Sequence, residues 1–430
     1  MNPRSVKVGL LGCGHVGSAL VRLITENGDA IEARTGVHLE VSRVAVRNLA
    51  RERDVALPAS VFTHDATSVV TDEDVDIVVE VIGGIEPARE LIIEALKAGK
   101  PVVTANKELL ANVGKELFEA AEGAGVDLLF EASVAGGIPL IRPLRESLAG
   151  DRIRRVMGIV NGTTNYILSN MTESGASFSD ALAEAQTLGY AERDPTADVE
   201  GFDAAAKGAI IATIAFGARV VAGDVYREGI SEISDADIAS ARELGYAVKL
   251  LAVADETDQG IAVRVHPTML PVAHPLASVR DSFNALFIEA DAVGELMFYG
   301  RGAGGMPTAS AVLGDVIDAA KNLVSGARGA TVGTLARKPI RPIDEVESQF
   351  YLQLEVADEP GVLAVIAEQF GQRGVSIKSM QQMGIGSEAR LIFITHLARE
   401  ADLRATIHSL REVGAVHRVG SVLRVMGDEG

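Results

Sequence analysis

The residues VKVGLLGCGHVGSALVRLI, from Val6 to Ile24, decide the fold of the N-terminal part of the chain. An apolar run to Leu11 predicts a strand, and apolar residues at helical spacing after Gly17 predict a helix. Between them Gly12 allows a tight turn, Gly14 lets a pyrophosphate approach the backbone, and Gly17 lets the helix pack on the strand. A helix that begins at this turn would point its N-terminus at the phosphates. The stretch therefore predicts a dinucleotide-binding turn.

We expect the cofactor to contact this turn through the backbone, so Cys13 and His15 are assigned no side-chain chemistry. The residues concerned are Gly12, Cys13, Gly14, His15, Val16 and Gly17.

The second predicted strand, 39–46, bears on the choice between NAD and NADP. NAD sites usually carry an acidic residue at its end for the ribose 2′-hydroxyl, but here Val46 is followed by Arg47 and Asn48. Arg47, with Arg51 or Arg53 nearby, favours a 2′-phosphate and hence NADP. The alternative is an exposed arginine at the start of a polar helix.

Three further apolar runs, 76–82, 101–104 and 127–131, alternate with helical patterns and predict a mostly parallel sheet covered on both faces. Lys107 follows the fourth strand. Ligands collect at the carboxyl ends of such strands, so Lys107 is expected to serve catalysis or cofactor binding. A lysine at a helix start without a role is the alternative.

A second stretch with candidate functional residues runs from Gly189 to Lys207, GYAERDPTADVEGFDAAAK. It places five carboxylates and a lysine before an apolar helix. Asp203 and Lys207 are four residues apart and so are neighbours on a helix. Desolvation lowers the pKa of a lysine, whereas an adjacent aspartate favours the charged form, which makes a poised acid. The alternative is a solvated loop with an ordinary ion pair.

Composition limits the classes of function. The 430 residues carry a formal charge of −19, which argues against binding to nucleic acid or anionic membranes. The single cysteine, Cys13, excludes an intrachain disulfide framework and suggests a reducing compartment. Arg4 and Lys7 before an apolar run resemble a signal peptide superficially, but the glycine turn explains that run better. We expect a cytoplasmic protein of two or three domains.

The C-terminal third contains two more informative stretches. A glycine-rich segment that includes Gly304 precedes a predicted helix at 307–322, and its backbone amides could return to the cofactor. After a linker rich in glycine and proline, residues 350–425 give the order βαββαβ, a ferredoxin-like unit.

Taken together, these motifs resemble the homoserine dehydrogenase family in its long form with a C-terminal ACT domain. The resemblance spans nearly the whole chain and rests on motifs that occur in the family's order. They are GLLGCGHVG, TANKELLA, EASVAGGIP, VNGTTNYIL, GYAERDPTADVEGFDAAAK, GAGGMPTASAV and, for the ACT domain, DEPGVLAVIAEQFGQRGVSIKSMQQ.

The resemblance implies a fold with three parts: a Rossmann-type doubly wound domain, an α+β catalytic and dimerisation domain, and a ferredoxin-like ACT domain. Their expected extents are 1–132 plus about 303–325, 133–302, a linker at 326–347, and 348–430. It also implies a homo-oligomer, either a dimer or a tetramer. We expect no aspartate kinase domain before the Rossmann strand.

The reaction implied by the resemblance is reversible hydride transfer between NADP or NAD and aspartate 4-semialdehyde, which gives homoserine. Lys207 matches the family's proton-donating lysine, Lys107 a second important lysine near substrate and nicotinamide, and Asp203 an acid of the same site. The residues expected to bind the substrate or shape its pocket are Glu192, Asp198, Gly162, Thr163 and Tyr190.

Two further sites follow from the resemblance. Family members bind a monovalent cation, usually sodium, and the matching candidates are Glu131 and the carbonyls of Val134, Gly136 and Ile138, against the alternative of a structural turn. ACT domains resemble one another as amino-acid sensors, which makes Asp358 and Gly361 candidates for an effector site. Threonine is the expected effector, and a non-regulatory oligomerisation domain is the alternative.

Two rival functions remain at this stage. Another Rossmann oxidoreductase that acts on an amino-acid-derived carbonyl would not need the acidic stretch. A dinucleotide-dependent amino-acid sensor without catalysis would suit the ACT domain, but the presence of both lysines with the acids argues against it.

Overall fold

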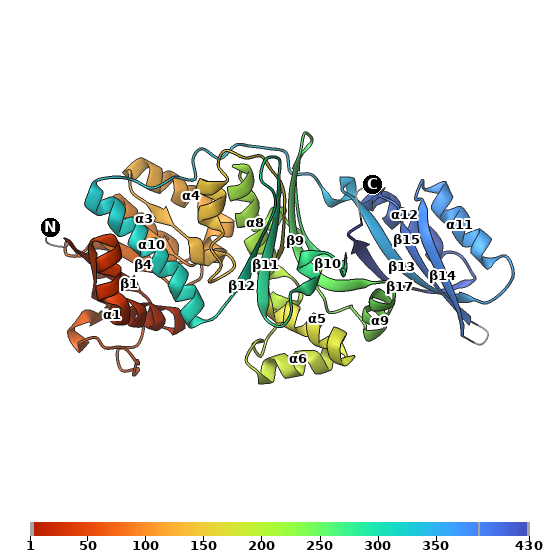
Figure 1. Cartoon of the computed structure of the whole chain (residues 1–430), viewed down its shortest axis with the longest axis horizontal. Coiled ribbons are helices and arrows are strands. Elements are labelled where there is room, and N and C mark those ends of the chain that lie inside the picture. Colours follow the sequence, from red (N-terminus) through yellow and green to blue (C-terminus); the bar gives the residue numbers. More distant parts are fainter. Residues whose placement is uncertain (1–3, 386–387, 428–430) are drawn as a thin grey trace. The chain divides into compact units, whose positions relative to one another are not determined.

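The computed structural model describes residues 4–385 and 388–427. The chain forms two compact units, each built from separate stretches (Figure 1). The first contains the residues up to Val156, Ala206–Val225 and Phe283–Lys338, and the second contains Met157–Ala205, Tyr226–Ser282 and the residues from Pro339 onward.

The first unit contains a six-stranded parallel sheet with the order β3-β2-β1-β4-β5-β6. This order confirms the predicted doubly wound arrangement, in which strand order reverses beside β1. The strand predicted at 127–131 is shorter than expected, because Glu131 begins a 3₁₀ turn, η2 (Glu131–Ser133). The strands are β1 (Arg4–Leu11), β2 (Val37–Ala45), β3 (Phe62–Thr63), β4 (Ile77–Glu80), β5 (Val102–Thr104) and β6 (Leu128–Leu129).

Helices cover this sheet, and α1 and α10 lie side by side (Figure 1). Leu20 and Ile24 of α1 share one buried apolar cluster with Val312 and Val316 of α10. The helix formed by 305–325 therefore completes the core begun by the N-terminal strands. The helices are α1 (His15–Thr35), α2 (Ala66–Thr71), α3 (Ala88–Lys97), α4 (Lys107–Ala124) and α10 (Gly305–Ser325), with a 3₁₀ turn η1 (Ala59–Val61).

The first unit also contains an antiparallel hairpin and the apolar helix α8, which begins in the second unit. These elements are β11 (Phe283–Ala290), β12 (Gly294–Arg301), α8 (Phe202–Phe216), the π-helical turn η3 (Pro143–Ser147), the 3₁₀ turn η4 (Ala222–Asp224) and the start of β7 (Ile153–Ile159).

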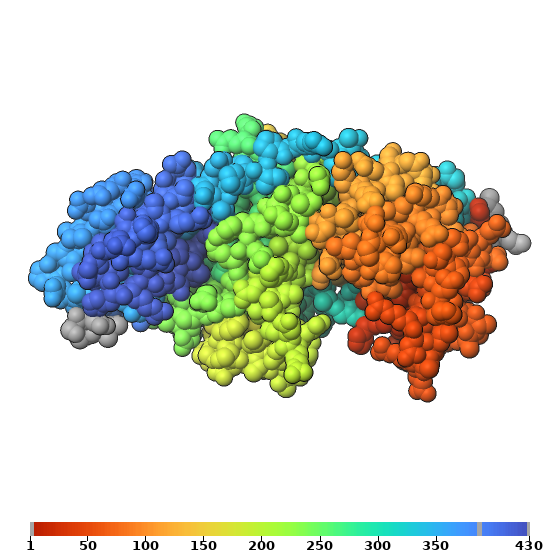
Figure 2. Space-filling model, turned by 180° about the vertical axis from the view of Figure 1, so that it is seen from behind, coloured from red at the N-terminus to blue at the C-terminus, as the bar shows by residue number. Residues whose placement is uncertain are grey.

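Residues 326–338, at the start of the predicted linker, are anchored to the first unit and belong to the light-blue strip at the top of Figure 2. The amide of Gly329 donates to Asp127 Oδ1 at 2.8 Å, and Lys338 Nζ donates to the carbonyl of Phe216 at 2.9 Å. This stretch lies along the unit as an ordered segment.

The stretches of the second unit before Pro339 are named the catalytic part after the prediction from the sequence, and they combine helices with a long antiparallel hairpin, β9 against β10. Helix α9 was not anticipated from the sequence; its signal is the capping box of Ser234 and Asp237. The elements are α5 (Gly162–Ser174), α6 (Phe178–Thr187), α7 (Thr196–Val199), β8 (Tyr226–Arg227), α9 (Asp235–Glu243), β9 (Tyr246–Thr257), β10 (Gly260–Pro271) and η5 (Pro275–Ser278).

The ACT part of the second unit has the predicted βαββαβ order, with strands arranged β17-β13-β15-β14. Alternation along β13 explains its core, since Phe350, Leu352 and Leu354 face the same cluster as Phe370 of α11 and Leu410 of α12. The elements are η6 (Ile343–Glu345), β13 (Glu347–Ala357), α11 (Val362–Gln372), β14 (Ile377–Ile385), β15 (Glu388–Thr395), β16 (Ala398–Arg399), α12 (Glu400–Arg411) and β17 (Val416–Val425).

Strand β17 joins the ACT part to the catalytic part within this unit. It runs parallel to β10, with Arg424 opposite Thr268, and Ser421 Oγ donates to Asp237 Oδ2 of α9 at 2.6 Å. Arg424 is buried and forms ion pairs with Glu228, from the loop after β8, and with Glu400 of α12.

Within the part of the chain that the structure describes, none of the helices has the length and apolarity needed to cross a membrane.

Candidate active site

The glycine turn has the geometry that its sequence predicts. Gly12 has φ +99°, and its amide donates to the carbonyl of Ala45 at 3.0 Å. A Cβ at Gly17 would lie 2.3 Å from the carbonyl oxygen of Gly12, so this position excludes any side chain. Gly14 is exposed, and a Cβ there would meet nothing within 4 Å. The backbone at the start of α1 is therefore open to a phosphate.

The segment that contains Gly304 lies beside this turn. Gly304 has φ +112° and precedes α10, and a Cβ at Gly305 would lie 3.1 Å from the carbonyl of His15. Two helix N-termini thus lie next to each other, neither with an acidic residue in its first turn. Both can direct unpaired backbone amides at an anion. This arrangement fits a dinucleotide pyrophosphate.

Arg47 is exposed in the loop that follows β2, at the carboxyl edge of the sheet. Arg53 shapes the same loop, because its guanidinium donates to the carbonyls of Arg51 and Asn48, both at 2.7 Å. Its guanidinium carbon also lies 5.6 Å from the centroid of the Phe62 ring. Of the arginines proposed for a 2′-phosphate, Arg53 is thus engaged with its own loop.

The start of α4, which carries Lys107, is held by a buried network. The carboxylate of Glu80 accepts the amides of Ile82 and Gly83 and the hydroxyl of Thr104. The side chain of Asn106 caps α4 by accepting the amide of Leu109 at 3.1 Å, and it donates to the carbonyl of Gly84 at 2.6 Å. Lys107 itself is exposed at the carboxyl ends of β4 and β5.

Two of the predicted acids meet at one amide. The side chain of Asn161 donates to Asp198 Oδ1 at 2.6 Å and to Asp203 Oδ2 at 2.9 Å. Its own carbonyl oxygen caps α5 by accepting the amide of Thr164 at 2.9 Å. The start of α5, the short helix α7 and the start of α8 thus converge on one buried amide.

Asn161 was missed as a site residue. Its signal was present in the motif VNGTTNYIL, where it was read only as part of a helix start. A residue that caps a helix with its oxygen still has an amide nitrogen to donate, and acids elsewhere in the sequence were available to accept.

Gly162 and Thr163, predicted as pocket residues, secure the same helix start. The hydroxyl of Thr163 donates to the carbonyl of Tyr190 at 2.6 Å. A Cβ at Gly162 would lie 2.6 Å from the carbonyl oxygen of Ser282, which explains why glycine is needed there. The ring of Tyr190 is 42% exposed and lies 4.9 Å from that of Tyr166.

Glu192 differs from the other predicted acids, because it is exposed and the described contacts engage only its backbone carbonyl, which accepts from Gln186.

Asp203 and Lys207 are each only 9% exposed and lie one turn apart on α8. The surface ion pair offered as an alternative is therefore wrong for this pair. A buried lysine beside a buried carboxylate is suited to proton transfer.

The predicted cation loop places its carboxylate among backbone amides. Glu131 accepts the amides of Leu140, Ile141 and Arg142, and its own amide donates to Asp315 Oδ2 at 2.8 Å. Burial raises the pKa of Asp315 to about 7. Glu131 Oε1 thus accepts two amides and Oε2 accepts one, so the carboxylate also serves the structural turn that is the alternative to a cation site.

The carbonyl candidates lie in a sharp turn next to Glu131. Ala135 and Gly136 both have positive φ, 57° and 55°, and a Cβ at Gly136 would lie 2.3 Å from the carbonyl of Gly302. Successive carbonyl oxygens in such a turn suit a hard cation. Among the described residues, no group of three or more His, Cys, Asp or Glu side chains is arranged to hold a metal.

In the ACT part, Asp358 follows β13, and Gly361, with φ +94°, precedes α11. Gln382 of β14 donates to Asp358 Oδ1 at 3.2 Å. A Cβ at Gly384 would lie 3.2 Å from Asp358 Oδ2, so the loop and strand β14 approach closely.

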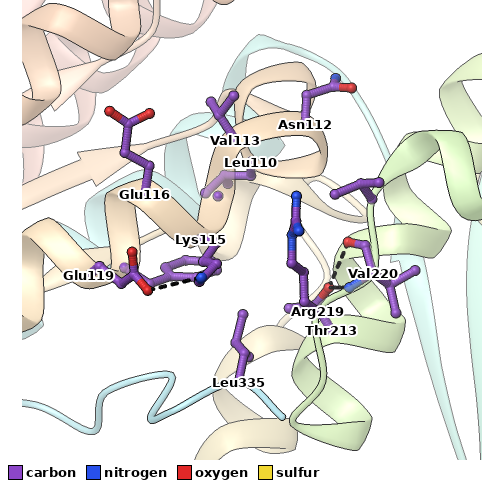
Figure 3. Close-up of a pocket in the computed structure, with 13 residues that line it drawn as sticks. Leu110, Asn112, Val113, Lys115, Glu116, Glu119, Thr213, Arg219, Val220 and Leu335 are labelled. Carbon is purple, nitrogen blue, oxygen red and sulfur yellow. Dashed lines mark hydrogen bonds and ion pairs between the residues drawn. The ribbon is translucent and has the colours of Figure 1, made fainter. Parts of the chain in front are cut away.

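A separate cavity of about 290 Å³ lies between α4 and the end of α8 (Figure 3). Arg219 extends into it between Lys115 and Glu119 on one side and Thr213 and Val220 on the other. Among the described residues, none of the predicted site residues lines this cavity.

The sheet order, the glycine turn and the buried lysine define a nicotinamide-dependent oxidoreductase with a separate substrate domain. Comparison with protein families extends this. Residues 12–131 match the NAD binding domain of homoserine dehydrogenase, 139–317 match homoserine dehydrogenase, and 350–423 match the ACT domain.

Relatives match over nearly the full length. The homoserine dehydrogenase of Corynebacterium glutamicum is 53% identical over 99% of this chain and 96% of its own, and that of Bacillus subtilis is 43% identical over 99% of both. The crystal structure of a homoserine dehydrogenase from Thiobacillus denitrificans is 42% identical, with a TM-score of 0.93 over 98% of both chains.

A hyperthermophilic archaeal homoserine dehydrogenase mutant in complex with NADPH is 31% identical, with a TM-score of 0.63 over 74% of this chain and 98% of its own. The chain therefore belongs to the homoserine dehydrogenase family.

Proposed function

We propose that the chain catalyses the reversible NADP-dependent reduction of L-aspartate 4-semialdehyde to L-homoserine, with Lys207 as the proton donor. The observation that carries this proposal is that buried Asn161 binds both half-buried Asp198 and buried Asp203, and that Lys207, one helical turn after Asp203, is only 9% exposed. Such a reaction belongs to the synthesis of threonine, methionine and isoleucine.

The chemistry of this site suits an amino aldehyde. A bound nicotinamide supplies the hydride in reduction and accepts it in the reverse direction. As charge develops on the carbonyl oxygen, the ammonium of Lys207 stabilises it and gives up one proton, so the aldehyde becomes an alcohol. Asp198 and exposed Glu192 hold the substrate's ammonium, and the carboxylate of Asp203 favours the charged form of Lys207.

The decisive experiment follows reduction of NADP at 340 nm with homoserine as substrate. Lys207→Ala should lower kcat by several orders of magnitude, while the affinity for NADP, measured by fluorescence titration, stays near that of the wild type. Exposed Lys115 on α4, changed to alanine, is the control and should leave kcat unchanged. Strong residual turnover in Lys207→Ala would remove this residue from proton donation.

We propose Arg47 as the residue that selects NADP, on the strength of its exposed position at the end of β2, where an acid would favour NAD. Arg47→Ala should raise the KM for NADP about tenfold or more and change that for NAD little, because one charge-assisted contact to a 2′-phosphate is lost. Equal effects on both cofactors would show that Arg47 does not contact the 2′-phosphate.

Two further assignments belong to the same proposal. The carbonyls of Val134, Gly136 and Ile138 would hold a monovalent cation, probed by replacing sodium with a large organic cation. The loop at Asp358 and Gly361 would bind an amino-acid effector, with threonine tested first as an inhibitor.

We also propose that the chain forms a homo-oligomer. Strand β14 ends the strand order of its sheet and carries the exposed side chain of Met383. Such an edge can pair with a second copy. Light scattering would distinguish a dimer from a tetramer.

A further inference from the structure

Lys249 is an unusual residue to find inside the second unit. It lies on β9, opposite Thr268 of β10, and only 4% of it is exposed. Its ammonium donates to Asn165 Oδ1 at 3.0 Å, to Ser169 Oγ at 3.4 Å and to the carbonyl of Val279 at 2.5 Å. All three donor positions of the ammonium are thus used, which a buried charge requires.

These acceptors belong to two separate elements. Asn165 and Ser169 lie one turn apart on α5, and Val279 begins the segment 279–282 that leads to β11. Asn165 also donates to the carbonyl of Asp281 at 3.0 Å and to that of Val279 at 3.4 Å. Lys249 and Asn165 therefore share one carbonyl, and together they hold α5 against 279–282.

The segment 279–282 in turn supports the substrate site. Asp281 has φ +53°, a conformation that costs free energy and persists only where neighbours enforce it. The next carbonyl, that of Ser282, lies against Gly162, the first residue of α5. The preceding residue, Asn161, holds Asp198 and Asp203.

We propose that Lys249 is a positioning residue of the substrate site. Its ammonium fixes α5 against residues 279–282 and so sets where Asn161 presents the two carboxylates. This role deepens the proposed function and rests on it, because the carboxylates matter only if they bind the substrate. Lys249 is not a catalytic residue, since it acts through Asn165 and the segment 279–282.

The test compares Lys249→Met, which keeps the volume of the side chain and removes its donors, with Lys100→Met. Lys100 is a matched control: it is 8% exposed and its ammonium donates to the carbonyls of Asp72 and Val75, in the nucleotide-binding part. Lys249→Met should raise the KM for homoserine about tenfold to a hundredfold and leave the KM for NADP unchanged. Lys100→Met should leave the KM for homoserine unchanged.

Asn165→Asp provides a second variant if Lys249→Met does not fold. The new carboxylate still accepts from Lys249 but no longer donates to the carbonyls of Val279 and Asp281. We expect a several-fold higher KM for homoserine, again with an unchanged KM for NADP. In the double variant the two effects should not add, because both residues act on one segment.

Two outcomes would overturn the role of Lys249: an unchanged KM for homoserine in a folded variant, or equal rises in both KM values, which would indicate general loosening. Failure of the proposed function is distinguishable, because the wild type would then not oxidise homoserine at all.

Discussion

At the scale of the residue, the buried lysine on β9 makes stability depend on pH. Burial lowers the pKa of Lys249 from 10.5 to about 8. The charge of Arg280 also lowers this pKa, whereas the carboxylates of Glu173 and Asp281 raise it and offset part of the shift. Between these two pKa values the unfolded chain binds more protons than the folded chain at this position. The contribution of Lys249 to stability therefore rises with pH across this window.

The comparison of wild type with Lys249→Met isolates this effect. The difference in free energy of unfolding between them should shift in favour of the wild type by about 3 kcal/mol between pH 8 and pH 10.5. Denaturant titrations at four pH values measure it. A difference that does not vary with pH would mean that Lys249 keeps its ordinary pKa in the folded protein.

Residue-level prediction from sequence was strongest where glycine or charge dictated the backbone. The turn at Gly12, Gly14 and Gly17 has the expected geometry. A Cβ at Gly12 or Gly17 would clash with the backbone, and Gly14 leaves open space at the start of α1. Asn161 and Lys249 were not anticipated, since the acids that Asn161 binds and the acceptors that Lys249 binds lie 30 or more residues away in the chain. Hydrogen bonds of such separation leave no local pattern in a single sequence.

At the scale of the element, the start of α4 depends on its cap. Asn106→Ala removes the cap to Leu109 and leaves the carbonyl of Gly84 without its donor, so it should cost about 1–2 kcal/mol of stability. Asn112→Ala, on an exposed face of the same helix, is the control and should change stability by less than about 0.5 kcal/mol. Chemical denaturation measures both, and equal losses would contradict the capping role.

Elements with strong periodicity could be predicted, whereas short or interrupted ones could not. Strands β1 and β13 follow their apolar patterns, and the βαββαβ order of the ACT part is as expected. The strand expected at 127–131 is only two residues long, because Glu131 leaves the strand direction and accepts the amides of residues 140–142. Helix α9 has few apolar residues, so its capping box was the only clear signal.

At the scale of the molecule, Arg424 is the charged link between the ACT and catalytic parts of the second unit. Its side chain is 6% exposed, and its loss leaves Glu228 and buried Glu400 without their partner. Arg424→Met should therefore destabilise this unit by about 3–5 kcal/mol. Arg418→Met removes an exposed side chain of the same strand that pairs with half-buried Glu355, and it should cost less than about 1 kcal/mol.

Thermal and chemical unfolding of both variants would check this expectation. A loss for Arg424→Met as small as that for Arg418→Met would show that the ion pairs of Arg424 contribute little to holding the two parts of this unit together. The sequence predicted the ACT part as a separate domain after a linker. It did not predict this pairing, because the paired residues Thr268 and Arg424 are 156 positions apart and parallel strands are not joined by a tight turn.

The placement of β17 has a consequence for the order in which the protein can be made. Strand β17 lies between β10 and β13, yet its residues, 416–425, leave the ribosome after those of every other described strand. Until then β10 and β13 each present an open edge during synthesis. Messages truncated shortly before codon 416 should therefore yield aggregating products, whereas the nucleotide-binding sheet would already be complete.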